Sequence, residues 1–168
     1  MYKLIEATLA PENFTALAQK YVKEMSQYDP SVVWDDETAE RVDACMVQTH
    51  LIEVDDKIIG FIQAHTQNIV PFDNMLIVDE LYVSPEYWER KFGTMAVKSI
   101  LKFWDGFVTI FIMTKNEAAR KFWASVADEL NLPITTTMEI PDESGQNLPD
   151  GEVWIMKRQE KDTIPEED

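Results

Sequence analysis

The stretch VDELYVSPEYWERKFGTMAVKSIL, residues 78–101, constrains the fold more than any other part of the sequence. An apolar run ending at Val83 predicts a strand, and Pro85 and Gly93 predict a turn before a helix begins. A strand that turns directly into a helix leaves the first backbone amides of that helix free, which favours an anionic phosphate group there. The helix would bury one face, formed by Phe92, Met95, Ala96, Ser99, Ile100 and Phe103.

The charge of the chain is strongly negative but unevenly placed. Its 168 residues contain 31 Asp and Glu against 15 Lys and Arg, a net charge of −16. Residues 90–121 carry seven basic and two acidic side chains, so this segment has a charge of +5 and the rest has −21. The overall charge argues against nucleic acid and anionic membranes as partners, whereas the local cations coincide with the predicted phosphate site.

The length of the chain predicts one domain, over residues 1–158, followed by an acidic, frayed tail at 159–168. No run approaches the ~18 apolar residues of a membrane span, and no apolar segment for export stands at the N-terminus. The single cysteine, Cys45, cannot form an internal disulfide, which favours a cytoplasmic location. One cysteine with two distant histidines makes no zinc signature, so we expect no metal.

The alternation of strand and helix patterns predicts an α/β domain in the order β-α-α-β-β-β-α-β-α-β-β. Pro11 suits the first turn of the first helix, Asp35 can cap the second, and Asn116 the last. The expected strands are 3–7, 50–54, 57–70, 74–83, 107–114, 134–140 and 152–158, with a turn-rich connector between the last two. Mixed strand directions and two crossover helices follow from this order.

This order, and above all the stretch from Leu81 to Thr94, resembles the GCN5-related N-acetyltransferase (GNAT) superfamily. The family segment often reads L-Y-V-x-P-x-Y-(R/W)-G-(K/R)-G-(I/Y)-(G/A)-T, and Glu89 and Lys91 stand at two of its glycine positions. A second family pattern, N-x-x-A-x-x-F-(Y/W), is met by Asn116, Ala119, Phe122 and Trp123. The resemblance implies a mixed, mostly antiparallel central sheet flanked by helices. The residues that fit the first pattern are Leu81, Tyr82, Val83, Pro85, Tyr87, Trp88, Arg90, Gly93 and Thr94.

The resemblance implies acetyl-coenzyme A as co-substrate. Its pantetheine arm would pair with the backbone of Leu81 and Val83, with Asn116 on its other side. Lys91 has two readings: it strains or covers the loop in place of glycine, or its ammonium binds the phosphates. By the same likeness the pyrophosphate would bind the amides of Phe92, Gly93, Thr94 and Met95, and the coenzyme site would include Tyr82, Trp88, Arg90 and Trp123.

Two carboxyl groups are candidates for the general base, Asp79 and Glu80, because they stand where the acceptor would arrive. Alternation along a strand predicts that they point to opposite faces, so at most one can serve; Glu80 is preferred because Tyr82 shares its face. Many relatives have a tyrosine that protonates the departing thiolate where this chain has Trp123. An indole N–H is not a usable proton source near neutral pH.

The acceptor is predicted from six acidic residues in and before the second helix. In the family this region flanks the acceptor groove, so a negative rim would favour a primary amine on a cationic small molecule or peptide. A solvated helix face explains the same charges equally well. The six residues are Asp29, Asp35, Asp36, Glu37, Glu40 and Asp43.

The sequence therefore predicts an acetyl-CoA-dependent N-acetyltransferase, with two alternatives. One is a catalytically degenerate binding protein on the same fold, which would explain Lys91 and Trp123 together. The other is an acidic interaction protein with a basic partner. The resemblance is also compatible with a homodimer formed through the last strands.

Overall fold

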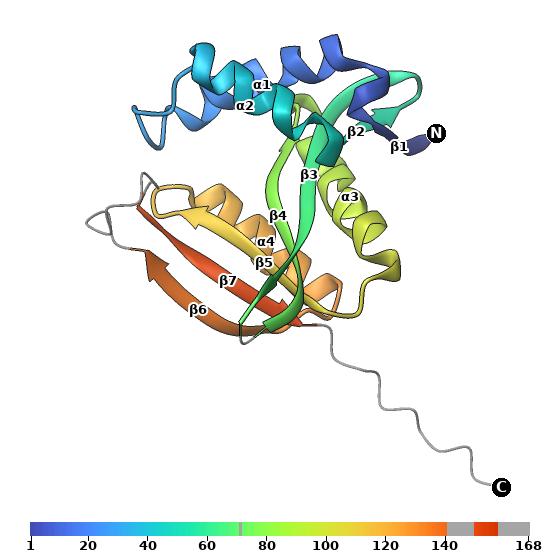
Figure 1. The fold of residues 1–168 in the computed structure, drawn as a ribbon. Coiled ribbons are helices and arrows are strands. Elements are labelled where there is room, and N and C mark those ends of the chain that lie inside the picture. The colour runs from blue at the N-terminus through green and yellow to red at the C-terminus, as the bar shows by residue number, and fades with distance from the viewer. Residues whose placement is uncertain (71, 141–149, 158–168) are drawn as a thin grey trace, which may run out of the picture.

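The computed structural model describes residues 1–70, 72–140 and 150–157, and within them the predicted order of elements is confirmed (Figure 1). The predicted tail at 159–168 and most of the connector before the last strand lie outside these residues. The helices are α1 (Pro11–Met25), α2 (Asp36–Cys45), α3 (Phe92–Ile100) and α4 (Glu117–Glu129). The strands are β1 (Tyr2–Glu6), β2 (Thr49–Val54), β3 (Lys57–Ile69), β4 (Phe72–Val83), β5 (Phe107–Met113), β6 (Ile134–Ile140) and β7 (Gly151–Lys157).

The strands form one sheet in the order β1-β2-β3-β4-β5-β7-β6. Strands β4 and β5 run parallel, and every other neighbouring pair is antiparallel. A parallel pair needs a crossover connection, and α3 supplies it here. The predicted mixed, mostly antiparallel sheet is thus confirmed.

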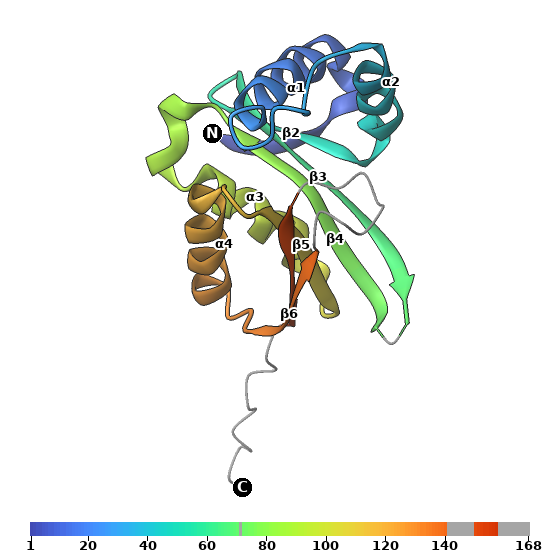
Figure 2. The same cartoon turned by 90° about the vertical axis from the view of Figure 1, so that its left-hand side faces the viewer.

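The four helices cover the sheet in two pairs (Figures 1 and 2). On one face, α1 buries Phe14 and Leu17 against Phe61 of β3 and Tyr82 of β4. On the other face, α3 and α4 bury apolar side chains against the middle strands. Because β4 has core contacts on both faces, residues near its end can take part in both layers.

Local signals in the sequence account for several element boundaries. Asp35 caps α2 by accepting from the Thr38 amide at 2.8 Å, as its position predicts. Pro11 occupies the first turn of α1. Asp55 and Asp56 join β2 to β3 with φ of 48° and 62°, the left-handed conformation that a tight two-residue hairpin turn requires.

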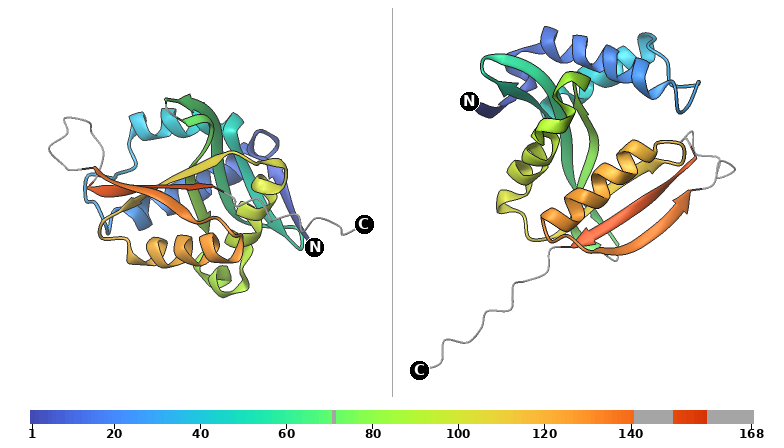
Figure 3. Two further views of the ribbon diagram at one scale, coloured as in Figure 1. Left: turned by 90° about the horizontal axis from the view of Figure 1, so that it is seen from below. Right: turned by 180° about the vertical axis from the view of Figure 1, so that it is seen from behind.

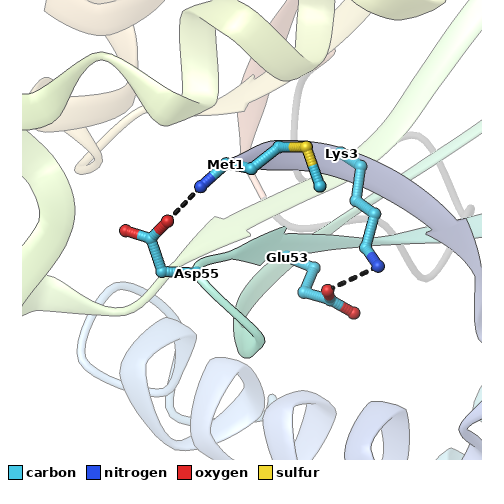
Figure 4. Close-up of polar contacts among 4 residues, drawn as sticks. All are labelled: Met1, Lys3, Glu53 and Asp55. Atoms are coloured by element: carbon cyan, nitrogen blue, oxygen red, sulfur yellow. Dashed lines mark hydrogen bonds and ion pairs between the residues drawn. The ribbon is translucent and has the colours of Figure 1, made fainter.

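Strand β1 lies at the edge of the sheet and is held to β2 by charged pairs as well as by its backbone (Figure 4). Lys3 stands opposite Glu53, and their charged groups are 2.8 Å apart. The amino group of Met1 bonds to Asp55 in the hairpin turn, and this bond holds the pKa of the Asp55 carboxyl below its usual range. These contacts add to the backbone pairing of the edge strand.

Strands β4 and β5 separate partway along their length. They pair only from Met75 to Val78 on β4 and from Phe107 to Ile110 on β5. Beyond this point β4 continues to Val83 beside β3, while β5 continues beside β7. The two halves of the sheet therefore diverge, as the rear view in Figure 3 shows. Among the described helices, none is long and apolar enough to cross a membrane.

Candidate active site

The end of β4 offers a free backbone edge where β5 has turned away. The Ser84 amide donates to the Ile59 carbonyl of β3 at 2.8 Å. Because backbone groups alternate in direction along a strand, those of Leu81 and Val83 point away from β3, toward the opening. The Val83 carbonyl accepts a bond from the indole Nε1 of Trp88 at 2.6 Å. An extended ligand could pair with the other groups of this edge as an added strand does.

The start of α3 presents unpaired amides beside that edge. The first backbone bond of the helix runs from the Met95 amide to the Lys91 carbonyl at 2.9 Å. The amides of Phe92, Gly93 and Thr94 precede it and have no partner within the helix, and no side chain caps this end. Three free amides and the helix dipole suit an anion. The amide of Met95 is occupied within the helix.

Lys91 has the backbone conformation for which the family pattern places a glycine. Its φ of 59° and ψ of 17° lie in the left-handed region. Its side chain extends to α4, where Nζ lies 2.8 Å from a Glu129 carboxylate oxygen, and it is 69% exposed. Arg90 packs over the Tyr87 ring at 5.7 Å. The loop thus keeps the turn without glycine, and both cations lie near the helix start on solvent-exposed side chains.

The end of α1 lies next to the start of α4. Asn116 caps α4 by accepting from the Ala119 amide at 3.0 Å, and its Nδ2 lies 4.0 Å from the Met25 sulfur at the end of α1. Trp123 is also buried, with 7% of its surface exposed against 9% for Asn116, and it packs edge-on against Phe122. Asn116 is therefore a buried helix cap that contacts the end of α1, and Trp123 belongs to the core.

A β-bulge interrupts β4 next to the candidate base. Gln63 of β3 lies opposite Glu80, and Ala64 lies opposite Val78, so Asp79 is an extra residue on β4. An extra residue bends the strand and breaks the alternation of side chains. The bulge falls just after the last residue of β4 that pairs with β5. It therefore coincides with the point where the sheet opens.

The bulge brings both carboxyl groups to one face, and the expectation that they point to opposite faces is wrong. Gln63 and His65 share a face of β3, and Gln63 lies opposite Glu80. Asp79 reaches that same face, because its Oδ2 lies 2.7 Å from Nδ1 of His65. Strict alternation fails here because the expectation assumed no inserted residue.

Glu80 is bonded to a tyrosine of α1. The hydroxyl of Tyr21 donates to Oε2 of Glu80, and both side chains are partly buried. The pKa of Glu80 is raised from 4.5 to about 7, and removal from water is the main cause. The Tyr21 hydrogen bond and the Arg41 charge lower this pKa, whereas the Asp79 charge raises it. Burial and the charge of Glu80 hold the pKa of Tyr21 well above 10. A carboxyl group with a pKa near 7 is suited to general-base chemistry at neutral pH.

Tyr21 and His65 are the site residues that sequence reasoning missed. Tyr21 lies at helical spacing among apolar residues, a pattern typical of a core position, and His65 lies within a predicted strand. One signal was available for Tyr21: a phenol on a buried helix face requires a hydrogen-bond partner. The identity of that partner, 59 positions away, has no local signal.

The acidic residues of α2 lie in solvent, which fits both the predicted negative rim and a solvated helix face. Asp36, Glu37, Glu40 and Asp43 are exposed on the helix. The charge of this helix that acts on Glu80 is the positive charge of Arg41, which lowers the pKa of Glu80. The negative charge that raises the pKa of Glu80 comes from Asp79, on the same strand.

A sequence model of the acetyltransferase (GNAT) family matches residues 10–127. This match spans more than half of the chain, which therefore belongs to the GNAT family. It includes α1, the bulged strand, the loop at Lys91 and most of α4. Curated proteins gave no match to this sequence.

Solved structures share the fold over nearly the whole chain. Diaminobutyrate acetyltransferase EctA from Paenibacillus lautus, in complex with L-2,4-diaminobutyric acid and coenzyme A, matches with TM-score 0.60 and 15% identity, over 96% of each chain. Naa50 from Arabidopsis thaliana, bound to a bisubstrate analogue, matches with TM-score 0.55 and 16% identity, over 94% of this chain and 98% of that one. Ard1 from Thermoplasma volcanium matches with TM-score 0.59 and 12% identity, over 95% and 99%. At these identities the likeness shows a common fold.

Family membership confirms the resemblance seen in the sequence and the predicted fold. It also confirms the prediction that the protein is an acetyltransferase with acetyl-coenzyme A as co-substrate. The roles of individual residues remain predictions. The cytoplasmic location and the homodimer also remain predictions.

Proposed function

We propose that the protein transfers the acetyl group of acetyl-coenzyme A to a primary amine of a cationic small molecule or peptide, with Glu80 as general base. One observation carries the proposal. A carboxyl group with a pKa of about 7 lies on β4 where the strand leaves β5, one residue before the free backbone edge that begins at Leu81. The proposed base, Glu80, and the first residue of the backbone edge proposed to bind the coenzyme, Leu81, are thus adjacent in the sequence.

The coenzyme would bind mainly to backbone groups. The amides of Phe92, Gly93 and Thr94 would hold the pyrophosphate, while Leu81 and Val83 would pair with the extended arm. Lys91 and Arg90, both solvent-exposed, would add charge near the phosphates, and Lys91 would leave Glu129 to do so. This assignment accounts for the cationic segment in an otherwise acidic chain.

The acetyl transfer would proceed by direct attack of the amine on the thioester carbonyl. Glu80 accepts a proton from the amine, directly or through water, as the nitrogen–carbon bond forms. The carbon–sulfur bond then breaks, and the thiolate takes a proton from solvent, since Trp123 is buried and cannot donate one. Positioning of the two substrates supplies much of the acceleration.

A cationic acceptor is supported by carboxyl groups around the base. Asp79 and Glu80 share one face of β4, as described above. Glu24, on α1, contributes a third negative charge that acts on the hydroxyls of Tyr21 and Tyr82. Partial burial raises the pKa of Glu24, which an approaching ammonium group would lower again. These charges would attract an amine that carries further positive charge.

The test is calorimetric titration of the protein with acetyl-coenzyme A, using Lys91→Glu as the variant and Lys98→Glu as the matched control. Both variants change the net charge equally, but Lys98 lies in the last turn of α3, away from the free amides. We expect micromolar binding that Lys91→Glu weakens at least tenfold and Lys98→Glu leaves nearly unchanged.

Equal weakening by both variants would assign the effect to general charge and remove the phosphate site from this loop. Absence of binding at high micromolar coenzyme would favour the degenerate binding protein. In the case of binding, a screen of mono-, di- and polyamines by release of free thiol follows. A preference for uncharged amines would contradict the cationic acceptor.

A further inference from the structure

The hydrogen bond between Tyr21 and Glu80 joins the helix that covers the site to the strand that carries the candidate base. The two residues are 59 positions apart, and their contact lies in a partly buried layer between α1 and β4. Both are set close to the point where the sheet opens. The proposed reaction, as stated above, uses Glu80 and leaves this hydroxyl without a role.

We propose that Tyr21 is a positioning residue for Glu80. The Tyr21 hydroxyl fixes the direction of the Glu80 carboxylate and favours its ionised form. The inference rests on the proposed function for its catalytic meaning. The hydrogen bond itself can be tested separately.

The ring of Tyr21 is fixed independently of its hydroxyl. It packs edge-on against Phe61 at 5.7 Å and against Tyr82 at 6.0 Å between ring centroids. Such aromatic contacts hold a ring in one orientation. The hydroxyl is therefore aimed at Glu80 by packing that a phenylalanine would keep, so a single oxygen atom can be removed with little disturbance.

The direction of the bond determines its effect. An ionised carboxylate only accepts hydrogen bonds, and the phenol, with its raised pKa, remains a donor across the neutral range. The bond is stronger to the charged carboxylate than to the neutral acid, so it favours loss of the proton from Glu80. Without it, Glu80 would be protonated over more of the neutral range and could not accept a proton from the amine.

Two charged groups near Glu80 also act on its pKa. Arg41 of α2 also favours the ionised form, whereas Asp79 on the same strand opposes it. Asp79 is itself paired with His65 of β3. The Tyr21 hydroxyl, unlike these groups, bonds to the Glu80 carboxylate directly, so its removal is the sharpest perturbation.

The experiment is an infrared titration of the Glu80 carboxyl band between pH 5 and 10, with Glu80→Gln spectra subtracted to isolate it. We expect a midpoint near 7 in the wild type. In Tyr21→Phe the midpoint should rise by roughly 1 pH unit, the effect of one hydrogen bond to a charged group. Tyr2→Phe is the control. It removes a hydroxyl of β1 that bonds to Ser99 of α3, and it should leave the midpoint unchanged.

An unchanged or lower midpoint in Tyr21→Phe would overturn the inference. If that variant fails to fold, 3-fluorotyrosine at position 21 gives a second test, because its more acidic phenol is a stronger donor and should lower the midpoint. No change with 3-fluorotyrosine would also overturn it.

The infrared result does not depend on acetyl transfer, so the two proposals can fail separately. A raised midpoint in a protein that acetylates no amine would support the Tyr21 bond and contradict the proposed function. In an active enzyme, the acid limb of kcat/KM should move to higher pH in Tyr21→Phe by the same amount, with the rate recovering above pH 9. A purely structural loss would lower the rate equally at every pH.

Discussion

The two sides of the candidate site are built in different ways. On the proposed coenzyme side, backbone groups of one continuous segment, residues 81–94, form the free edge and the helix start. On the proposed acceptor side, side chains from separate elements meet: Tyr21 joins Glu80 across 59 positions, and His65 joins Asp79 across 14. The coenzyme side therefore depends on local geometry, whereas the acceptor side depends on how α1 and β3 pack around a bulge.

This difference predicts that substitutions on the two sides have separable effects. The acceptor side places a carboxyl group in a poorly hydrated position, which is unfavourable for folding but useful for proton transfer. The coenzyme side holds one strained residue, Lys91, and otherwise uses groups that every residue has. Substitutions of Tyr21 or Glu80 should thus affect catalysis far more than coenzyme binding.

The largest expected effect is that of Glu80→Gln on acetyl transfer. The amide keeps the shape of the side chain and cannot accept a proton, so kcat/KM should fall by about 10²- to 10⁴-fold. Calorimetric affinity for acetyl-coenzyme A should stay within threefold of the wild type. Retention of most activity in this variant would remove Glu80 as the base and would direct attention to the His65–Asp79 pair.

The same variant should raise stability at alkaline pH. The folded pKa of Glu80, about 7, lies above its ordinary value of 4.5, so the folded state binds the proton more tightly than the unfolded state. The stabilising effect of the protonated group is complete below pH 4.5 and is lost as pH rises through 7. At pH 8 Glu80→Gln should therefore be more stable than the wild type by roughly 1–3 kcal/mol.

Urea unfolding at pH 4.5 and pH 8 measures this effect, since the advantage of the variant should shrink at the lower pH. An advantage of equal size at both pH values would assign it to a cause other than proton binding. Together with the kinetic result, it would show whether the acceptor side exchanges stability for activity.

A smaller effect is expected for Lys91, on the coenzyme side. Lys91→Gly removes both the left-handed strain and the ion pair with Glu129, whereas Lys91→Ala removes only the ion pair. The glycine variant should be more stable than the alanine variant by about 1 kcal/mol, the penalty of a side chain in this conformation. Thermal unfolding of the two variants gives this difference directly.

If alanine proves as stable as glycine at position 91, the loop has another conformation and the free amides of α3 lose their support. Both variants should weaken coenzyme binding to a similar degree, because both lack the ammonium group. A marked difference between them in affinity would indicate that the backbone conformation, and not the charge, controls binding.

The sequence was sufficient for the features that depend on neighbouring residues. Asp35 and Asn116 cap their helices as predicted, and Pro11 begins α1. Each is a local rule about one turn of backbone. The order of elements followed from periodicity for the same reason, and the strand, turn and helix of residues 78–101 were predicted from a continuous pattern.

The acceptor side could not be predicted in this way. The bulge at Asp79 is an unequal count of residues between two strands, and such a mismatch appears only when their register is known. The bond from Tyr21 to Glu80 depends on where α1 crosses the sheet. The pKa of Glu80 follows from that packing, since burial is its main cause. These are long-range properties of the folded chain.

The separation of β4 from β5 also makes the backbone itself a reporter of ligand binding. Amide hydrogens between Met75 and Val78 lie in a paired region of the sheet, where exchange with solvent is slow. Those of Leu81 and Val83 face the opening and should exchange with deuterium much faster. A ligand that pairs along this edge would slow exchange at these two positions and leave exchange unchanged at the β4 amides that bond to β3. Amide exchange along one strand would therefore report both the native fold and the bound state.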